Sequence, residues 1–463
     1  MPEQKIKGWW WRLDAPDKRL QGEIAYGATI GATVDLFGHI YDALDECRPT
    51  ERFTLHGLTL NDKPVTLFDC VVTKSNRHIP GGVSSVVESN FGIVGLHVAR
   101  VADIQFKTVS VRFNGLRDWT WISGIEHKYE QEPPKAVFSY EAPADVLVGR
   151  FDNLTAKLEF SADISPGPGK QSIEEKCLLK IEADALAPYF AFENLFHGFQ
   201  EFLSLALQRP SYAMEIIGNT DTPKQIIQGK KLYEDLLIIR HLSIREWDRE
   251  ELIPQDTLFT LSELSDPLEN VIRCYFLKRD RLQVPVDLYM STIYHPDQLL
   301  RARFLTLVQA IEAYHRVSMP GKYMDEKTYD TGLRELLWQA IPATIDADFR
   351  EALKNKLKYL HEFSLRKRIE ALTHKYTTVI GKLLGSAADF ASTTSELRNR
   401  LTHPEPSHGG AKLDYKLLWH LSEKIALLLE TCFLDEFGFS ENRIKEIVRS
   451  RSQRARHVHF GAF

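Results

Sequence analysis

The chain has 463 residues, of which 43% are hydrophobic and 26% charged, and its formal net charge is −5. The length is too great for one ordinary core, so we expect two or three domains, and the composition is normal for a soluble globular protein. A net charge this small neither indicates nor excludes a nucleic-acid partner, because a local basic patch could still bind one.

The five cysteines are scattered singly along the chain, at Cys47, Cys70, Cys177, Cys274 and Cys432. The absence of any CxxC pair argues against a disulfide scaffold or a zinc ribbon and fits a reducing cytoplasm. The N-terminus lacks the apolar run of a signal peptide, and no stretch reaches the roughly 18 uninterrupted apolar residues of a membrane span. We therefore expect a cytoplasmic protein with no membrane partner.

Residues 1 to about 180 predict β-structure, because short runs rich in Val, Ile, Thr, Phe and Trp alternate with turn residues. A hairpin is expected over residues 52–72, and further strands are expected over residues 95–101 and 106–113. The Pro-Gly-Pro-Gly stretch within Ser165–Gly169 predicts a turn. These elements indicate a sandwich-like arrangement of strands.

Residues 187–208 carry aromatic and leucine side chains at helical spacing, which predicts a helix that packs on the β-layer and is ended by Pro210. The segment 211–262 is ambiguous, with strand-like patches at residues 238–239 and 258–261. Residues 1–262 show no recognisable catalytic set. We therefore expect a β-rich N-terminal region with a sensing or regulatory role.

From about residue 263 the sequence becomes helical, with apolar residues recurring at the spacing of one helix face. The predicted helices cover residues 300–314, 349–363, 366–384, 390–401 and 413–432. This pattern is typical of an up-and-down helical bundle, expected over residues 263–440 and followed by a basic tail over residues 441–463. The expected fold class is α+β, with a β-rich region preceding an all-α bundle.

The most informative segment is Glu396-Leu-Arg-Asn-Arg-Leu-Thr-His-Pro404. On a helix Asn399 and His403 are four residues apart and share a face, whereas Arg398 points about 100° away from Asn399. Pro404 disfavours helical backbone angles at His403. We therefore expect His403 at the fraying end of the helix, where its ring can turn toward Arg398.

An imidazole, a guanidinium and an amide in one partly exposed zone suit metal-free cleavage of RNA. Histidine can move a proton near neutral pH at the ribose 2′-OH or the leaving 5′-oxygen, which predicts a catalytic role for His403. Arginine can hold the phosphate bidentately as charge builds on it, which predicts the complementary role for Arg398. Asn399 could orient either the imidazole or the phosphate.

The bare spacing Arg-x4-His is weak evidence, because it occurs a second time at Arg454 and His459. That second copy lies in the charged tail, without an apolar stripe around it. The first copy stands at the end of a predicted bundle helix, with Asn399 directly after the arginine. From spacing alone, a solvated helix end with an incidental histidine remains the alternative.

Residues 398–403 resemble the R-φ-x-x-x-H signature of the HEPN superfamily, in its common form with Asn after Arg. Residues 304–316 resemble the first helix of the ApeA-like HEPN group, and residues 364–369 resemble the segment between that helix and the motif. Gly8-Trp-Trp-Trp11 and the β-rich region after it are similar to the ApeA N-terminal domain. The resemblance covers most of the chain, in the right order.

The resemblance implies a helical bundle that often dimerises so that Arg and His line a shared cleft. Many HEPN proteins are metal-independent endoribonucleases of toxin, abortive-infection or CRISPR-linked systems, and ApeA-like proteins are bacterial anti-phage proteins. It therefore implies an RNA substrate, with tRNA as one candidate, and a homodimer or higher even oligomer. An unknown phage-derived trigger is implied as well, and no metal or other cofactor is expected.

Further residues are candidates for supporting roles. Glu312 and His315 lie three apart on the first bundle helix and could reach the site, although Glu312 could instead pair with Arg316. A basic cluster could guide RNA phosphates, or form an ordinary solvated helix face. Its members, with one more arginine next to the motif, are Arg366, Lys367, Arg368 and Arg400.

A second class of function is a non-catalytic scaffold of a defence complex, in which the β-rich region binds a ligand and the bundle dimerises. A carbohydrate-active β-sandwich enzyme is a weaker third reading, since no carboxylate pair can be assigned to it. The intact Arg-Asn-x-x-x-His set favours the ribonuclease.

Overall fold

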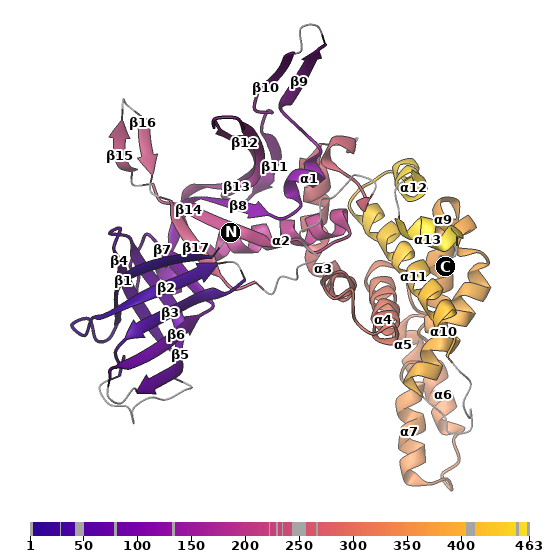
Figure 1. Cartoon of the computed structure of the whole chain (residues 1–463). Helices are drawn as coiled ribbons and strands as arrows, with labels where there is room; N and C mark the ends of the chain where they lie inside the picture. The colour runs from indigo at the N-terminus through magenta and orange to yellow at the C-terminus, as the bar shows by residue number, and fades with distance from the viewer. Residues whose placement is uncertain are drawn as a thin grey trace. The chain divides into compact units, whose positions relative to one another are not determined.

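The computed structural model describes residues 3–27, 29–41, 51–77, 81–131, 135–221, 223–227, 230–233, 235–242, 256–264, 267–403, 413–450 and 453–460. The chain forms two compact units (Figure 1). The first comprises Met1–Pro254 and Phe259–Ile272, and the second comprises Gln255–Leu258 and Arg273–Phe463. The division falls inside helix α3 (Leu268–Tyr294), about ten residues beyond the boundary that the sequence predicts.

The first unit is built on one 13-stranded sheet whose neighbouring strands are antiparallel. The strand order is β11-β12-β13-β8-β14-β17-β7-β5-β4-β1-β2-β3-β6. The bounds are β1 Gln4–Arg12, β2 Leu20–Gly27, β3 Gly31–Phe37, β4 Phe53–Thr59, β5 Pro64–Arg77, β6 Val83–Ser89, β7 Phe91–Val94, β8 Gln105–Phe113, β11 Val146–Phe151, β12 Leu154–Ser165, β13 Ser172–Pro188, β14 Ala213–Asn219 and β17 Leu236–Arg240. Two separate hairpins are formed by β9 (Ile125–Glu130) with β10 (Lys135–Tyr140), and by β15 (Pro223–Ile227) with β16 (Lys230–Tyr233).

Six of these strands close into a ring, because β6 also pairs with β5. The first half of β5 pairs with β4 and β7, and its second half pairs with β6, where the register shifts between Val72 and Lys74. Trp10 on β1 fills the interior, and a Cβ at Gly57 would lie 2.3 Å from its ring. The β-rich prediction is confirmed, but the strands form one continuous sheet rather than two facing layers.

Helix α2 (Tyr189–Leu207) packs on β8 and β13, as the sequence predicts, through an aromatic cluster that includes Phe106 and Phe192. The strand predicted over residues 95–101 is wrong, and of the two strand-like patches only residues 238–239 lie in a strand, β17. Residues 95–100 form no strand, because β7 ends at Val94 and Gly95 turns the chain at a φ of 108°. Residues 258–261 lead instead into the 3₁₀ turn η5 (Leu261–Glu263). Two short helical elements, η2 (Val101–Asp103) and α1 (Leu116–Thr120), complete the described parts of this unit.

The second unit is a helical bundle, as predicted. After α3 its elements are α4 (Leu300–Ser318), α5 (Glu326–Thr328), the π-helical turn η6 (Tyr329–Leu333), α6 (Arg334–Gln339), α7 (Ala347–Leu357), α8 (Leu365–Lys375), α9 (Thr377–Leu384), α10 (Ala387–Thr402), α11 (Tyr415–Glu436), α12 (Glu441–Ser450) and α13 (Gln453–Phe460). Helix α11 is the buried centre and packs against α4 and α13. The helix predicted over residues 366–384 is divided at Tyr376 into α8 and α9.

The predicted basic tail is wrong as a separate element, because α12 and α13 pack on the bundle. Ile444, Ile447 and Val448 are spaced as one helix face and are buried. This apolar stripe is short and lies among many charged residues. The number of charges in the segment therefore suggests an exposed tail instead of a packed helix. Within the described part of the chain, no helix has the length and apolar character needed to cross a membrane.

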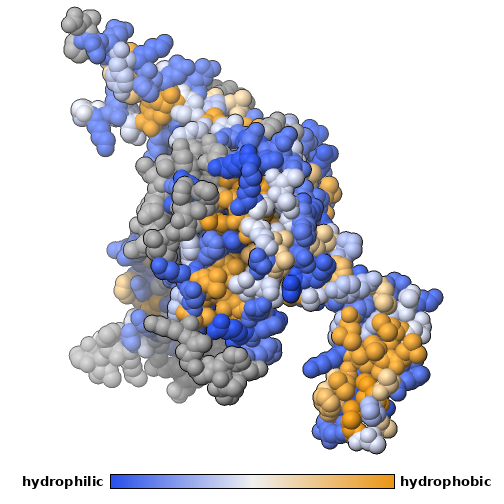
Figure 2. Space-filling view, turned by 90° about the vertical axis from the view of Figure 1, so that its right-hand side faces the viewer, coloured by the Kyte–Doolittle hydropathy of each residue, from blue (hydrophilic) through white to orange (hydrophobic). Residues whose placement is uncertain are grey.

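Helices α6 and α7 project from the rest of the bundle (Figure 1). Apolar side chains gather on this projection, at the lower right of Figure 2. Exposed apolar residues here include Leu333 at the end of η6, Leu336 on α6 and Phe349 on α7, with exposed fractions of 44%, 65% and 57%. An apolar face of this kind is unusual on a surface that only meets water.

Candidate active site

The Arg-Asn-x-x-x-His motif occupies the last turns of α10. Phe390, Thr394 and Leu397 are buried and fix this helix in the bundle. Arg398 is half-buried and Asn399 is exposed. The Arg398 Nη1 donates a hydrogen bond of 3.1 Å to the Asn399 Oδ1, so the amide orients the guanidinium.

Helix α10 ends at Thr402, and His403 follows with non-helical angles of φ −130° and ψ 72°. The backbone N–H of His403 donates to the carbonyl oxygen of Asn399 at 2.8 Å, and the residue is exposed. The prediction that this histidine stands at the helix end is confirmed. Pro404, on which that prediction partly rested, lies outside the described residues.

Arg398 faces an open groove of about 690 Å³ in the helical unit. The groove is lined from α4, from α8 with the segment before it, and from α10. Its walls are Glu312, Arg316, Tyr323, Tyr359, Leu360, Glu362, Phe363, Ser364, Leu365, Arg366, Ser395, Arg398 and Asn399. The structure thus brings together Arg398, Asn399, Arg366 and Glu312 of the sequence-predicted residues, while His403 does not line this groove.

The groove carries free positive charge. Arg316 is neutralised, since it bonds to Glu312 at 3.0 Å and to Glu362 at 2.6 Å. Arg366 and Arg398 form no ion pair within the described residues. Two guanidiniums are therefore available to an anion, and bidentate binding of phosphate is the contact to which a guanidinium is best suited.

Arg368 is buried, with 2% of its surface exposed, and this corrects its predicted role as an RNA contact. Its guanidinium bonds to the Phe363 carbonyl oxygen at 3.0 Å, to Glu362 at 3.3 Å and to the His315 Nδ1 at 3.1 Å. A Cβ at residue 321 would lie 2.5 Å from its Nη1, which explains Gly321. Arg368 therefore supports the groove wall from inside.

His315 is fully buried beneath the groove and cannot exchange protons with a substrate in this conformation. An arginine only donates, so the Nδ1 of His315 accepts from Arg368 and its proton resides on Nε2. Burial, with the nearby charges of Arg368 and Arg316, lowers the pKa of His315 from 6.5 to about 4. His315 is therefore a neutral structural group, while Glu312 lines the groove and pairs with Arg316.

The depressed pKa of His315 makes the bundle acid-sensitive. The folded state keeps this histidine neutral, whereas the unfolded chain binds a proton below pH 6.5, so acid favours unfolding between pH 6.5 and about 4. We expect this group to remove up to about 3 kcal/mol of stability over that range. Urea unfolding of the His315→Gln variant, which keeps an acceptor but cannot titrate, should show a shallower pH slope. An unchanged slope would count against this role.

The remaining basic candidates lie outside the groove. Lys367 is exposed and pairs with Glu370 at 3.3 Å, and Arg400 is exposed on the last turn of α10. Sequence reasoning missed Tyr323 and Phe363, which also line the groove. They meet because Lys322 and Glu362 form an antiparallel β-bridge between distant segments, for which the sequence carries no local signal.

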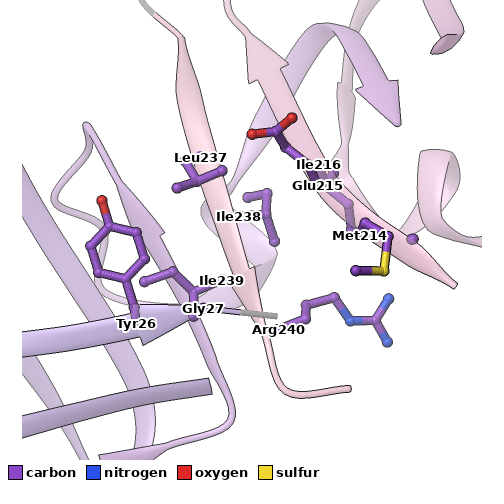
Figure 3. A pocket seen from close by; sticks show the side chains of 10 residues that line it. Tyr26, Gly27, Met214, Glu215, Ile216, Leu237, Ile238, Ile239 and Arg240 are labelled. Atoms are coloured by element: carbon purple, nitrogen blue, oxygen red, sulfur yellow. The ribbon is translucent and has the colours of Figure 1, made fainter. Parts of the chain in front are cut away.

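Another hollow lies in the first unit, between β2, β14 and β17 (Figure 3). Tyr26, Met214 and Arg240 are among its walls, but its volume is only about 20 Å³. A space of this size holds about one water molecule, so it is no ligand site.

A helical bundle that places an Arg-Asn-x-x-x-His motif at a helix end beside a cationic groove has the features of a HEPN domain. Residues 305–443 match the family model described as Apea-like HEPN, and residues 5–275 match the one described as ApeA N-terminal domain 1. The second match covers more than half of the chain, so the chain belongs to the ApeA family and carries a C-terminal HEPN domain. No curated protein and no solved structure matched.

HEPN domains are generally ribonucleases that bind RNA and often dimerise. The two matches therefore support an anti-phage HEPN effector with ribonuclease activity.

Proposed function

We propose that this chain is a metal-independent endoribonuclease of an abortive-infection system that cleaves RNA through Arg398 and His403. The observation that carries the proposal is the guanidinium of Arg398, which lines an open groove without an ion-pair partner in the described residues and is oriented by Asn399. His403 belongs to the same motif and is exposed at the helix end. Transfer RNA is one candidate substrate.

In the proposed reaction, the ribose 2′-oxygen attacks the adjacent phosphorus in line as the bond to the leaving 5′-oxygen breaks. His403 takes the 2′-OH proton as a base, or donates a proton to the leaving oxygen as an acid. Arg398 binds the non-bridging phosphate oxygens, whose negative charge grows in the transition state. The products are a 2′,3′-cyclic phosphate and a 5′-OH.

The arrangement of the motif supports a site made by two copies of the chain. His403 lies beyond the end of α10 with non-helical backbone angles, so the helix does not place it beside Arg398. Of Arg398 and His403, only the arginine lines the groove. We propose that a second copy of the chain places its motif next to that of the first. Each Arg398 then acts together with the His403 side chains of both copies.

The exposed apolar face of α6 and α7 is the surface proposed for this contact. Leu360, in the segment that follows α7, is a groove wall and is 56% exposed. Light scattering should show an even oligomer for the wild-type chain and a monomer without RNase activity for Leu336→Glu. Leu277 on α3 is 79% exposed and lies off this face, so Leu277→Glu should behave as wild type. A wild-type monomer with full RNase activity would disprove the composite site.

For the first unit we propose a regulatory role that answers a phage-derived trigger. It forms its own compact body around a closed ring of strands, while the motif and the groove belong wholly to the second unit. A fragment of residues 263–463 should fold and cut RNA without the trigger that the full chain needs. A fragment that shows native helical circular dichroism but cleaves no RNA would contradict this proposal.

A further inference from the structure

An aromatic pair stands on the wall of the groove that holds Arg398. Tyr323 and Phe363 both line it, with ring centroids 4.7 Å apart in an edge-to-face arrangement. Tyr323 is 61% exposed, and its hydroxyl has no hydrogen-bond partner in the described residues. The Tyr323 ring is not part of the hydrophobic core and its hydroxyl is not engaged, so the ring is available to a ligand.

The pair is held rigidly from the backbone. The Tyr323 N–H donates to the His361 carbonyl oxygen at 2.8 Å, and the Phe363 N–H donates to the Gly321 carbonyl oxygen at 2.7 Å. Behind this short ladder, the buried Arg368 bonds to the Phe363 carbonyl oxygen and to Glu362. The Tyr323 ring therefore stands on a fixed backbone, and little conformational entropy is lost when a flat ligand stacks on it.

One groove thus offers two kinds of contact. The guanidiniums of Arg366 and Arg398 can bind a phosphate, and the faces of Tyr323 and Phe363 can stack on a planar ring. A nucleotide carries both groups, and about 690 Å³ is within the range of pockets that hold small ligands. Phosphate contacts alone would require no exposed aromatic pair.

We propose that Tyr323, supported by Phe363, binds a nucleobase of the RNA next to the phosphate that Arg398 holds. This inference rests on the proposed ribonuclease function and adds the residue that recognises the substrate. A base can stack on Tyr323 only if it is out of a double helix, so the groove selects an unpaired nucleotide. Its aromatic face accepts a base through stacking, which tolerates different sequences.

The test measures binding separately from cleavage, with the full chain carrying His403→Ala. Fluorescence anisotropy compares three probes of equal length: an unstructured RNA dodecamer, the abasic ribose-phosphate dodecamer and a fully paired RNA duplex. The unstructured RNA should bind roughly 5- to 150-fold more tightly than the abasic probe, the range typical of one stacked base. The duplex should bind no better than the abasic probe.

Adding Tyr323→Leu should erase the preference for the base-bearing probe and leave the affinity for the abasic probe unchanged. Tyr323→Phe should retain the preference, because it keeps the ring and loses only an unbonded hydroxyl. Tyr129 is 67% exposed on β9 in the other unit, so Tyr129→Leu is the matched control and should also retain it. Thermal melting checks that each variant is folded.

Equal binding of the RNA and abasic probes by the parent, or a preference that survives Tyr323→Leu, would overturn the proposal. A wild-type chain that shows the preference but never cleaves RNA would refute the nuclease and leave the base contact standing. Cleavage without any preference for the base-bearing probe would refute the base contact and leave the nuclease standing. Failure of every RNA to bind would remove both.

Discussion

His403→Ala should lower the rate of RNA cleavage by at least the roughly 10²- to 10⁴-fold that one acid–base group supplies. The side chain is exposed after the last turn of α10, so its loss should leave the thermal unfolding of the chain unchanged. His374 on α8 is also exposed and is not a groove wall, which makes His374→Ala the matched control with wild-type activity. A folded and active His403→Ala protein would refute the proposed chemistry.

Arg398→Lys should also cleave RNA slowly. The ammonium group of lysine cannot reproduce the bidentate contact with phosphate or keep the geometry of the hydrogen bond to Asn399. Arg334 on α6 pairs with Asp330 away from the groove, so Arg334→Lys should retain activity. If Arg398→Lys and Arg398→Ala both cleave RNA normally, Arg398 does not hold the reacting phosphate and the proposed mechanism is refuted.

The products identify the mechanism independently of the variants. Cleavage by the 2′-oxygen should leave a 2′,3′-cyclic phosphate and a 5′-OH, should continue in EDTA and should fail where the attacking 2′-OH is replaced by hydrogen. End-labelling and mass spectrometry distinguish these ends from the alternatives. Products with a 5′-phosphate that form only with Mg²⁺ would contradict a reaction run by His403 and Arg398.

The largest expected effect on stability comes from Arg454, at which the Arg-x4-His spacing occurs for the second time. Its guanidinium reaches from α13 into the bundle and pairs with Glu430 and Glu423 of α11. Glu430 is 1% exposed, and burial raises its pKa against the opposing effect of Arg454. Arg454→Ala would leave that carboxyl buried without its cation, at a cost of about 3–5 kcal/mol.

Urea unfolding followed by circular dichroism measures this loss. The double variant Glu430→Gln, Arg454→Met should recover much of it, because it removes both charges instead of one. Lys322→Ala also breaks an ion pair of the helical unit, but both partners are exposed, so it should change stability far less. An Arg454→Ala protein as stable as the wild type would show that α13 is not held by this contact.

The features that the sequence predicted correctly are those with a local cause. Helices α4, α10 and α11 follow from apolar residues repeated at helical spacing, which is a property of each segment alone. The placement of His403 at a helix end likewise follows from its neighbour, since a proline restricts the residue before it. The family signature is itself a run of six residues.

Tertiary structure alone decided which of several equivalent residues faces the site. Arg366, Lys367 and Arg368 carry the same charge in sequence, but successive helical residues point about 100° apart, so packing puts Arg366 on the groove and Arg368 in the interior. Packing also distinguishes Arg398 from Arg454, although both begin an Arg-x4-His spacing. Arg398 lines the groove, whereas Arg454 pairs with the buried Glu430.

Contacts between distant segments were beyond any local pattern. The closure of the six-stranded ring depends on β3 meeting β6, as Val34 does with Val87, and the aromatic wall of the groove depends on the bridge between Lys322 and Glu362. Neither pairing changes the composition or periodicity of the segments that make it. The sequence therefore determined where the catalytic motif lies, while the fold determined what surrounds it, because a partner forty residues away is chosen by packing and not by spacing.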